Sequence, residues 1–291
     1  MTILVTGATG NVGRQVVEQL VQRGARVRAL VRNLEKAQFP AGVEVVQGDL
    51  LDVDALRGAF SGVKALFLLN AVVPDEFTQA LVALNVAKQA GVDRVVYLSV
   101  IHSDVYVNVP HFAGKLLAER MIEQMGFSAT ILRPAYFFDN DLTIQQVVRD
   151  YGVYPTPIGS KGLAMIATRD IAEIAAIELV KRADAAGPLP STRFNLVGPD
   201  TLTGADVAAI WSDVLQRPIA YAGDDTAAFE QNLRQFMPPW MAYDMRLMAE
   251  RFQSDGMHPA AGDVERLTAL LGRPLHTYRE FAAGVAAQAA A

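Results

Sequence analysis

Short apolar runs alternate with longer amphipathic stretches over the first 135 residues, and this alternation restricts the fold more than any other feature. The runs are nearly continuous in apolar side chains, which is typical of strands buried on both faces of a parallel sheet. The expected strands cover residues 2–6, 26–31, 43–47, 64–69, 94–99 and 128–133, and the expected helices cover residues 11–23, 52–60, 74–90 and 111–125. Such strand–helix alternation predicts an α/β fold with a doubly wound parallel sheet and right-handed crossovers.

The pattern changes after about residue 150. Residues 163–180 are expected to form a strand that turns into a helix at Thr168, and residues 193–197 another strand. We therefore expect a first domain over residues 1–150, completed by strands near 163–167 and 193–197. Residues 201–291 are expected to form a smaller, mostly helical lobe that contacts substrate or a partner.

Composition excludes several function classes. The chain has 291 residues, no cysteine, four histidines and a net charge of −5. Thiolate metal sites, disulfides and cysteine nucleophiles are therefore excluded, and no histidine pair has a short metal-ligand spacing. The charge balance predicts no nucleic-acid partner and no anionic membrane partner. The absence of a long apolar run and of a secretory signal predicts a cytoplasmic protein.

A glycine-rich turn gives the sharpest functional signal. Gly7, Gly10 and Gly13 have the spacing GxxGxxG directly after the first expected strand, at the start of the first expected helix. Gly7 allows a tight turn, Gly10 lets backbone amides approach a diphosphate, and Gly13 lets the helix pack close to the strand. The helix N-terminus adds N–H groups and the positive end of its dipole. The sequence therefore predicts a Rossmann-like dinucleotide site.

The end of the second expected strand bears on the choice of dinucleotide. A site selective for NAD(H) usually has an acidic residue there, which holds a ribose hydroxyl. This chain instead has Arg32, with Lys36 one turn further on, and both could pair with a 2′-phosphate. NADP(H) is therefore favoured. The alternative is that Arg32 is a solvated strand-end residue and that NAD(H) is also accepted.

The expected helix at 111–125 carries two polar residues, His111 and Lys115, four positions apart. Short-chain reductases have Tyr-x-x-x-Lys here, with the lysine on the nicotinamide ribose and the tyrosine as acid or base. In this chain the lysine is present and histidine replaces the tyrosine. His111 could donate a proton near neutral pH or merely bond a loop, and Lys115 could instead be a solvated surface residue. Tyr136 is the alternative proton donor or a pocket wall.

The same helix has an apolar series. Leu117, Met121 and Met125 recur every four residues. We expect this series to form the buried face of the helix.

Together these motifs resemble the NmrA-like group of atypical short-chain dehydrogenases/reductases. The resemblance rests on TGATGNVGR at 6–14, Arg32-Asn33, GDLLD at 48–52, HFAGK at 111–115 with Glu119 following, and LRPAYFFDN at 132–140. It implies a Rossmann-like fold that binds NADP(H). It also implies one of two activities: reduction of small quinones, dyes or phenylpropanoids, or redox sensing without turnover.

The resemblance also implies site residues. Lys115, His111 and Tyr136 are the catalytic candidates. Ser99 falls near the serine of catalytic members, although Val100 is equally close to that position. The implied cofactor-binding residues are Gly7, Ala8, Thr9, Gly10, Asn11, Val12 and Gly13 for the diphosphate, Arg32 and Lys36 for the 2′-phosphate, Asp49 and Leu50 for the adenine, Leu69, Asn70 and Ala71 for the ribose, and Ser99, Lys115, Phe137 and Asn140 toward the nicotinamide.

Three functions are compatible with these sequence features. The first is an NADPH-dependent reductase of a small quinone-like or conjugated aromatic acceptor, whose electrophilicity makes positioning sufficient for hydride transfer. The second is a non-catalytic NADP(H) sensor that acts through a protein partner, favoured by the missing tyrosine. The third is a sugar-nucleotide epimerase, which ranks last because its chemistry needs that tyrosine.

Overall fold

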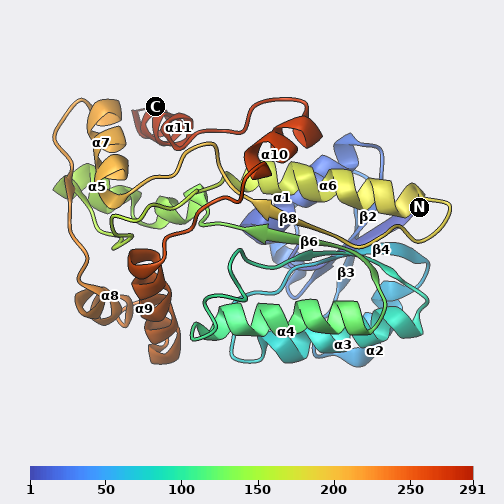
Figure 1. Ribbon diagram of the computed structural model, residues 1–291. Coiled ribbons are helices and arrows are strands. Elements are labelled where there is room, and N and C mark those ends of the chain that lie inside the picture. Colours follow the sequence, from blue (N-terminus) through green and yellow to red (C-terminus); the bar gives the residue numbers. More distant parts are fainter. Residues whose placement is uncertain (291) are drawn as a thin grey trace. The chain divides into compact units, whose positions relative to one another are not determined.

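A seven-stranded sheet in the order β3-β2-β1-β4-β5-β6-β8 organises the first part of the chain (Figure 1). The computed structural model describes residues 1–290, without the side chains of Lys36, Ala289 and Ala290. The strands are β1 Thr2–Val5, β2 Arg26–Val31, β3 Glu44–Gln47, β4 Val63–Leu68, β5 Arg94–Leu98, β6 Ser128–Pro134 and β8 Thr192–Leu196. The pairings β1–β2, β1–β4, β2–β3, β4–β5 and β5–β6 are parallel. The fold is the predicted Rossmann-like, doubly wound α/β fold.

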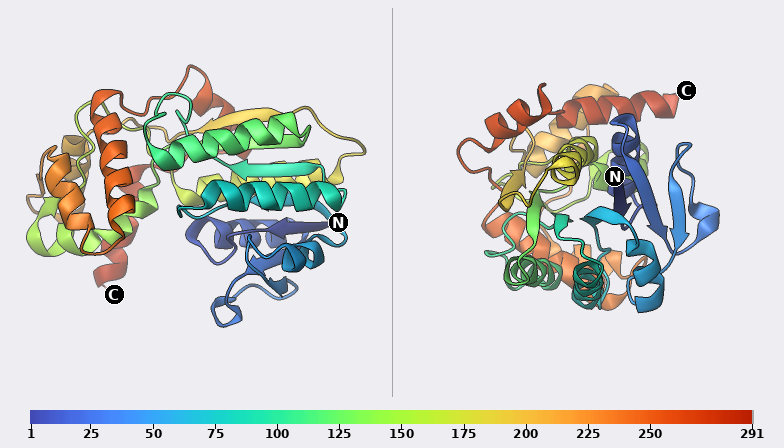
Figure 2. Two further views of the ribbon diagram at one scale, coloured as in Figure 1. Left: turned by 90° about the horizontal axis from the view of Figure 1, so that it is seen from below. Right: turned by 90° about the vertical axis from the view of Figure 1, so that its right-hand side faces the viewer.

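Helices cover both faces of this sheet (Figure 1). Helices α1 (Asn11–Gln22) and α6 (Thr168–Asp184) pack against each other on one face. The other face is covered by α2 (Val53–Phe60), α3 (Glu76–Gln89) and α4 (Pro110–Gln124). Both views of Figure 2 show α3 and α4 side by side. The first four helices and six strands lie within a few residues of the predicted ranges.

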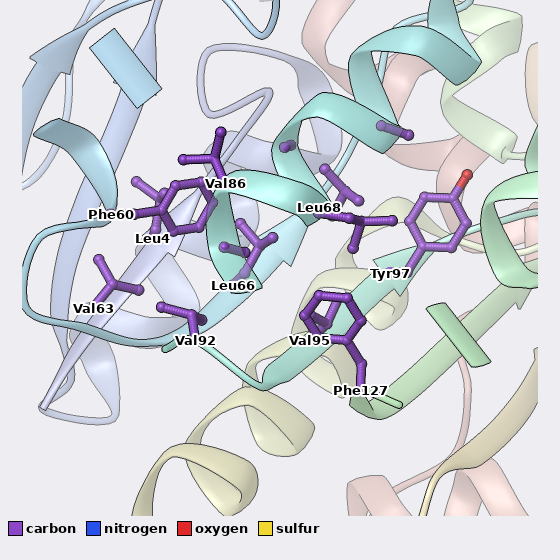
Figure 3. Packing of buried hydrophobic residues seen from close by; sticks show 14 of the residues in the cluster. Leu4, Phe60, Val63, Leu66, Leu68, Val86, Val92, Val95, Tyr97 and Phe127 are labelled. Carbon is purple, nitrogen blue, oxygen red and sulfur yellow. The ribbon is translucent and has the colours of Figure 1, made fainter. Parts of the chain in front are cut away.

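A hydrophobic core fills the space between the sheet and α2, α3 and α4 (Figure 3). It includes Leu66 and Val95 from the sheet and Phe60 from α2, each fully buried. Burying an aliphatic or aromatic side chain of this size contributes about 1.5–3 kcal/mol. Tyr97 also belongs to this core, and Figure 3 shows its hydroxyl directed away from the other labelled side chains.

The described chain divides into two compact units that interleave along the sequence. The first unit comprises residues 1–103, 111–133 and 168–194, and the second comprises residues 104–110, 134–167 and 195–291. The second unit is mostly helical, as expected for the C-terminal part. Its elements are η2 Phe138–Thr143, α5 Gln145–Tyr151, β7 Val153–Tyr154, α7 Gly204–Leu215, β9 Ala220–Tyr221, α8 Thr226–Leu233, α9 Pro239–Ser254, α10 Asp263–Leu271 and α11 Tyr278–Ala290.

Residues 163–167 differ from the prediction. The expected strand near 193–197 exists as β8, whereas 163–167 contains only isolated bridges and lies in the second unit. Leu163 N–H donates to Leu202 at 2.9 Å, Ala164 to Met257 at 2.8 Å and Ile166 to Tyr136 at 2.9 Å. Because these bonds go to three different segments, no continuous ladder forms, although the segment is as apolar and buried as a central strand.

The buried face of α4 also differs from the prediction. Leu117 is half exposed, at 50%, and Met121 and Met125 are only partly buried. The face that packs inward instead carries Phe112, Lys115, Ala118, Glu119 and Ile122. An apolar series at helical spacing misidentifies this face because two of the inward positions are charged.

None of the helices within residues 1–290 combines the length and hydrophobicity needed to cross a bilayer.

Candidate functional site

The order in which successive strands are added to the sheet reverses between β1 and β4. Strands β2 and β3 extend from one side of β1, and β4, β5, β6 and β8 extend from the other. In open parallel sheets, ligands bind at the carboxyl ends of the strands at such a switch point. Here the two strand ends are joined by Thr6, which is fully buried. Its hydroxyl accepts from Leu69 N–H at 2.8 Å and donates to Leu69 O at 3.0 Å.

The glycine turn follows Thr6 and has no room for side chains. Gly7 has φ +61°, a conformation that L side chains rarely adopt. A Cβ on Gly13 would lie 2.1 Å from Gly7 O, and one on Gly10 would lie 3.2 Å from the same atom. The three glycines therefore bring the start of α1 against the end of β1, as the sequence predicts.

The N-terminus of α1 has free backbone donors. Gly10 is the N-cap residue, no side chain caps it, and the first turn contains no acidic residue. The first N–H groups of a helix have no partner within the helix, and they carry the positive end of its dipole. Ala8, Thr9, Asn11 and Val12 lie in or beside this turn. The glycine turn and this helix N-terminus, residues 7–13, form a glycine cradle. The cradle therefore fits a dinucleotide diphosphate.

The residues predicted for the adenine end lie at the ends of β2 and β3. Arg32 follows β2 directly and is exposed. Within the described residues its guanidinium has no hydrogen-bonded partner, which leaves it available to an anion. Lys36 ends the short helix η1 (Leu34–Lys36), and its side chain lies outside the described residues. Asp49 accepts from Leu51 N–H at 2.9 Å, and Leu50 is partly buried against the core.

Asn70 follows β4 and is 3% exposed. Neither its amide nitrogen nor its amide oxygen has a hydrogen-bond partner in the described part of the chain. A buried amide without partners costs about 1–3 kcal/mol, so a ligand that satisfied it would be stabilised. Its neighbours differ: Leu69 is half buried and lies against Gly7, and Ala71 is exposed. Asn70 therefore fits a polar ligand at the switch point.

Lys115 is the one buried lysine among those whose side chains the structure describes. Its Nζ lies 2.6 Å from Oε1 of Glu76, in the first turn of α3. The side chains of Lys115 and Glu76 are 9% and 7% exposed. The alternative of a solvated surface lysine is therefore excluded. His111 is half buried in the first turn of α4, with its ring edge-on to that of Phe112.

Ser99 follows β5, is 3% exposed, and donates its hydroxyl to Glu119 of α4. Glu119 also accepts from Arg133, with Nη2–Oε2 at 2.6 Å and Nε–Oε1 at 2.9 Å. Because its hydroxyl proton is already donated to Glu119, Ser99 is poorly suited to donate a hydrogen bond to a substrate. The Ser99 contact and the replacement of the tyrosine by His111 both argue against ordinary alcohol dehydrogenase chemistry.

In the second unit, Tyr136 belongs to a buried polar cluster around Asp141, which is 1% exposed. Asp141 accepts from Tyr136 at 2.8 Å, from Tyr154 at 3.2 Å and from Tyr278 at 2.5 Å, and Trp211 Nε1 donates to Tyr278 at 3.0 Å. Burial raises the pKa of Asp141 to about 6, against the lowering effect of the three phenol donors. Burial and the nearby Asp141 carboxylate raise the pKa of Tyr136 well above its ordinary value.

The second unit also contains the two residues predicted for the nicotinamide end. Phe137 is half buried at the start of η2, and Asn140 is exposed within it. Their role toward a cofactor stays a prediction.

Sequence reasoning named Glu119 after the HFAGK motif without giving it a role, and it missed two other carboxylates of these surroundings, Glu76 and Asp141. Glu119 lies four residues after Lys115, so helical spacing places both on one face of α4. Glu76 and Asp141 gave no local signal, because their partners lie on other elements.

A switch point with a glycine cradle after β1 defines the class of Rossmann-like domains. The NmrA-like family model matches residues 1–282. The chain is 31% identical over 290 residues to an NAD(P)H azoreductase of Xenophilus azovorans, covering 98% of each chain. It is 29% identical over 284 residues to quinone oxidoreductase 2 of Escherichia coli, covering 96% of each.

Solved structures agree with these relatives. An NADPH-dependent quinone oxidoreductase of Escherichia coli, in complex with NADPH, matches with a TM-score of 0.86 and 27% identity, over 98% of this chain and 99% of that one. A triphenylmethane reductase of Citrobacter sp. in complex with NADP(H) matches with a TM-score of 0.83 and 25% identity, over 98% and 99%. The chain belongs to the NmrA-like family.

The close approach at Gly13 predicts that Gly13→Ala destabilises the protein. The new Cβ would overlap Gly7 O, and overpacking of this kind costs roughly 1–3 kcal/mol. Gly58→Ala is the matched control, because Gly58 lies in α2 with no atom within 4 Å of an added Cβ. It should stabilise by about 0.5–1 kcal/mol. Urea unfolding measures both, and equal free energies of unfolding for the two variants would contradict the packing argument.

The raised pKa of Asp141 predicts a pH dependence of stability. The folded-state pKa of about 6 exceeds the ordinary value of 3.8, so ionisation is harder in the folded protein. The contribution of this group is therefore fully present below pH 4 and is lost as pH rises through about 6, by roughly 3 kcal/mol. Unfolding free energies measured between pH 4 and 7 check this.

Asp141→Asn is the control for that measurement. It removes the titrating group while keeping an acceptor oxygen for the tyrosines, so this decline should be absent from the variant and should account for the difference between wild type and variant. A variant whose stability still follows the wild-type pH profile would show that another group titrates.

Proposed function

We propose that this protein is an NADPH-dependent reductase that transfers hydride to a small quinone-like or conjugated aromatic acceptor. The observation that carries the proposal is the switch-point site: an uncapped helix N-terminus packed on the glycine turn, with the unpaired Asn70 amide at the end of β4. The named activities of the azoreductase, quinone oxidoreductase and triphenylmethane reductase relatives support the same cofactor and acceptor class.

The residues present fit the cofactor. Backbone N–H groups from Gly7 to Gly13 would hold the diphosphate, and Arg32 and Lys36 would hold the 2′-phosphate. Asp49 and Leu50 would flank the adenine, and Leu69, Asn70 and Ala71 would line the ribose. Lys115 would donate to the nicotinamide ribose, and Ser99 would lie toward the nicotinamide.

When bound, NADPH supplies a hydride, two electrons with one hydrogen, and leaves as NADP⁺. A quinone that accepts this hydride and one proton becomes a hydroquinone. The protein's contribution is chiefly to position the two reactants, since such acceptors are electrophilic. Because Ser99 already donates to Glu119 and Tyr136 to Asp141, we assign the proton to His111 or to water.

The direct test is titration of the purified protein with NADPH, followed by acceptor-dependent NADPH oxidation across a panel of quinones, azo dyes and triphenylmethane dyes. We expect saturable NADPH binding and turnover with at least one acceptor. Saturable binding with no turnover would overturn the reductase proposal in favour of a sensor. Absence of binding would overturn both.

Cofactor choice gives a separate prediction at Arg32. Arg32→Ala should raise the Kd for NADPH about tenfold or more and leave that for NADH unchanged, because one charge-assisted contact to the 2′-phosphate is lost. Arg26→Ala is the matched control, since Arg26 is exposed at the opposite end of the same strand. Calorimetric titration of both variants measures this. Equal losses of affinity for NADPH and NADH would show that Arg32 does not contact the 2′-phosphate.

A further inference from the structure

The ion pair between Glu76 and Lys115 joins two helices on the same face of the sheet. Glu76 is the first residue of α3, and Lys115 lies in the middle of α4, 39 residues further along the chain. The atoms Nζ and Oε1 lie 2.6 Å apart, and both side chains are nearly fully buried. A pair with this geometry is a fixed structural contact and not one of several surface conformations.

Such a pair is costly to bury. Taking each charge out of water costs several kcal/mol, and an apolar pair of the same volume is often equally stable or more so. The surroundings reduce this cost only in part. The positive end of the α3 dipole favours the Glu76 carboxylate. Burial raises the pKa of Tyr97 well above its ordinary value, and the nearby negative charges of Glu76 and Glu119 raise it further. Stability alone therefore explains this pair poorly.

The hydrogen-bonding capacity of Lys115 indicates a role. An ammonium group has three N–H donors, and in the described residues only Glu76 accepts from it. Two donors remain while the third fixes the group in place. Two remaining donors match the two adjacent hydroxyls of a ribose.

We propose that Glu76 is a positioning residue, which anchors the Lys115 ammonium so that its remaining donors meet the nicotinamide ribose of the cofactor. This inference rests on the proposed function. Glu76 does not touch the cofactor; it acts through Lys115 by holding the ammonium group in one orientation. Losing Glu76 should therefore weaken only the contacts that Lys115 makes.

The test compares two ligands on four proteins. NADPH contains the nicotinamide ribose, whereas adenosine 2′,5′-bisphosphate contains only the adenylate half. Glu76→Gln keeps the side-chain shape but loses the charge, and it should raise the Kd for NADPH about five- to tenfold with no change for the bisphosphate. Lys115→Met should have at least the same selective effect. The double variant should resemble Lys115→Met alone, because the two residues act as one unit.

Glu178→Gln is the matched control. Glu178 is also a fully buried carboxylate with a lysine partner, Lys181 at 2.9 Å, and it lies in the same unit on α6. Its variant should lose stability with both affinities unchanged. Glu76→Gln with wild-type affinity for NADPH, or with equal losses for both ligands, would reduce Glu76 to a structural role and overturn the inference. Failure of the proposed function is distinguishable, because the wild-type protein would then either bind neither ligand or bind NADPH without reducing any acceptor, whatever the variants do.

Discussion

The site depends on the contact between the turn after β1 and the first turn of α1. A Cβ at Gly13 would stand 2.1 Å from Gly7 O, so this contact exists only because no side chain is present. It aims the uncapped amides of α1 at the carboxyl edge of the sheet. The Thr6 hydroxyl, bonded to both backbone groups of Leu69, then fixes the end of β4 beside that turn. The cradle and the strand end at Asn70 are therefore parts of one rigid arrangement.

Charged side chains on the buried side of α4 are held by partners from other elements. Lys115 pairs with Glu76, and Glu119 binds Arg133 and accepts the Ser99 hydroxyl. The Ser99 hydroxyl is thus a donor that is already used, and His111 stands where the Tyr-x-x-x-Lys motif has tyrosine. Both features suit the reduction of electrophilic acceptors, which needs orientation more than acid–base activation.

Agreement between sequence and structure is closest where the signal is local. Six strands and four helices of the first unit were predictable, because buried parallel strands are apolar throughout and the connecting helices are amphipathic. The same reasoning was wrong at 163–167, where an equally apolar segment pairs residue by residue with three different partners. It was also wrong about the inward face of α4, since Leu117 is half exposed while two charged residues are buried. Apolar periodicity finds buried positions only where the buried residues are apolar.

The sequence by itself determined the doubly wound fold and the glycine turn, and it singled out Lys115 as a candidate residue, because spacing along one strand or helix encodes each of them. The tertiary structure alone decided what surrounds these residues. Glu76 reaches Lys115 from 39 residues away, and Asp141 accepts from Tyr136 just before η2, from Tyr154 of β7 and from Tyr278 of α11. Local sequence spacing does not predict which side chain of another element a carboxylate will contact. Only the packing of the two elements shows the pair.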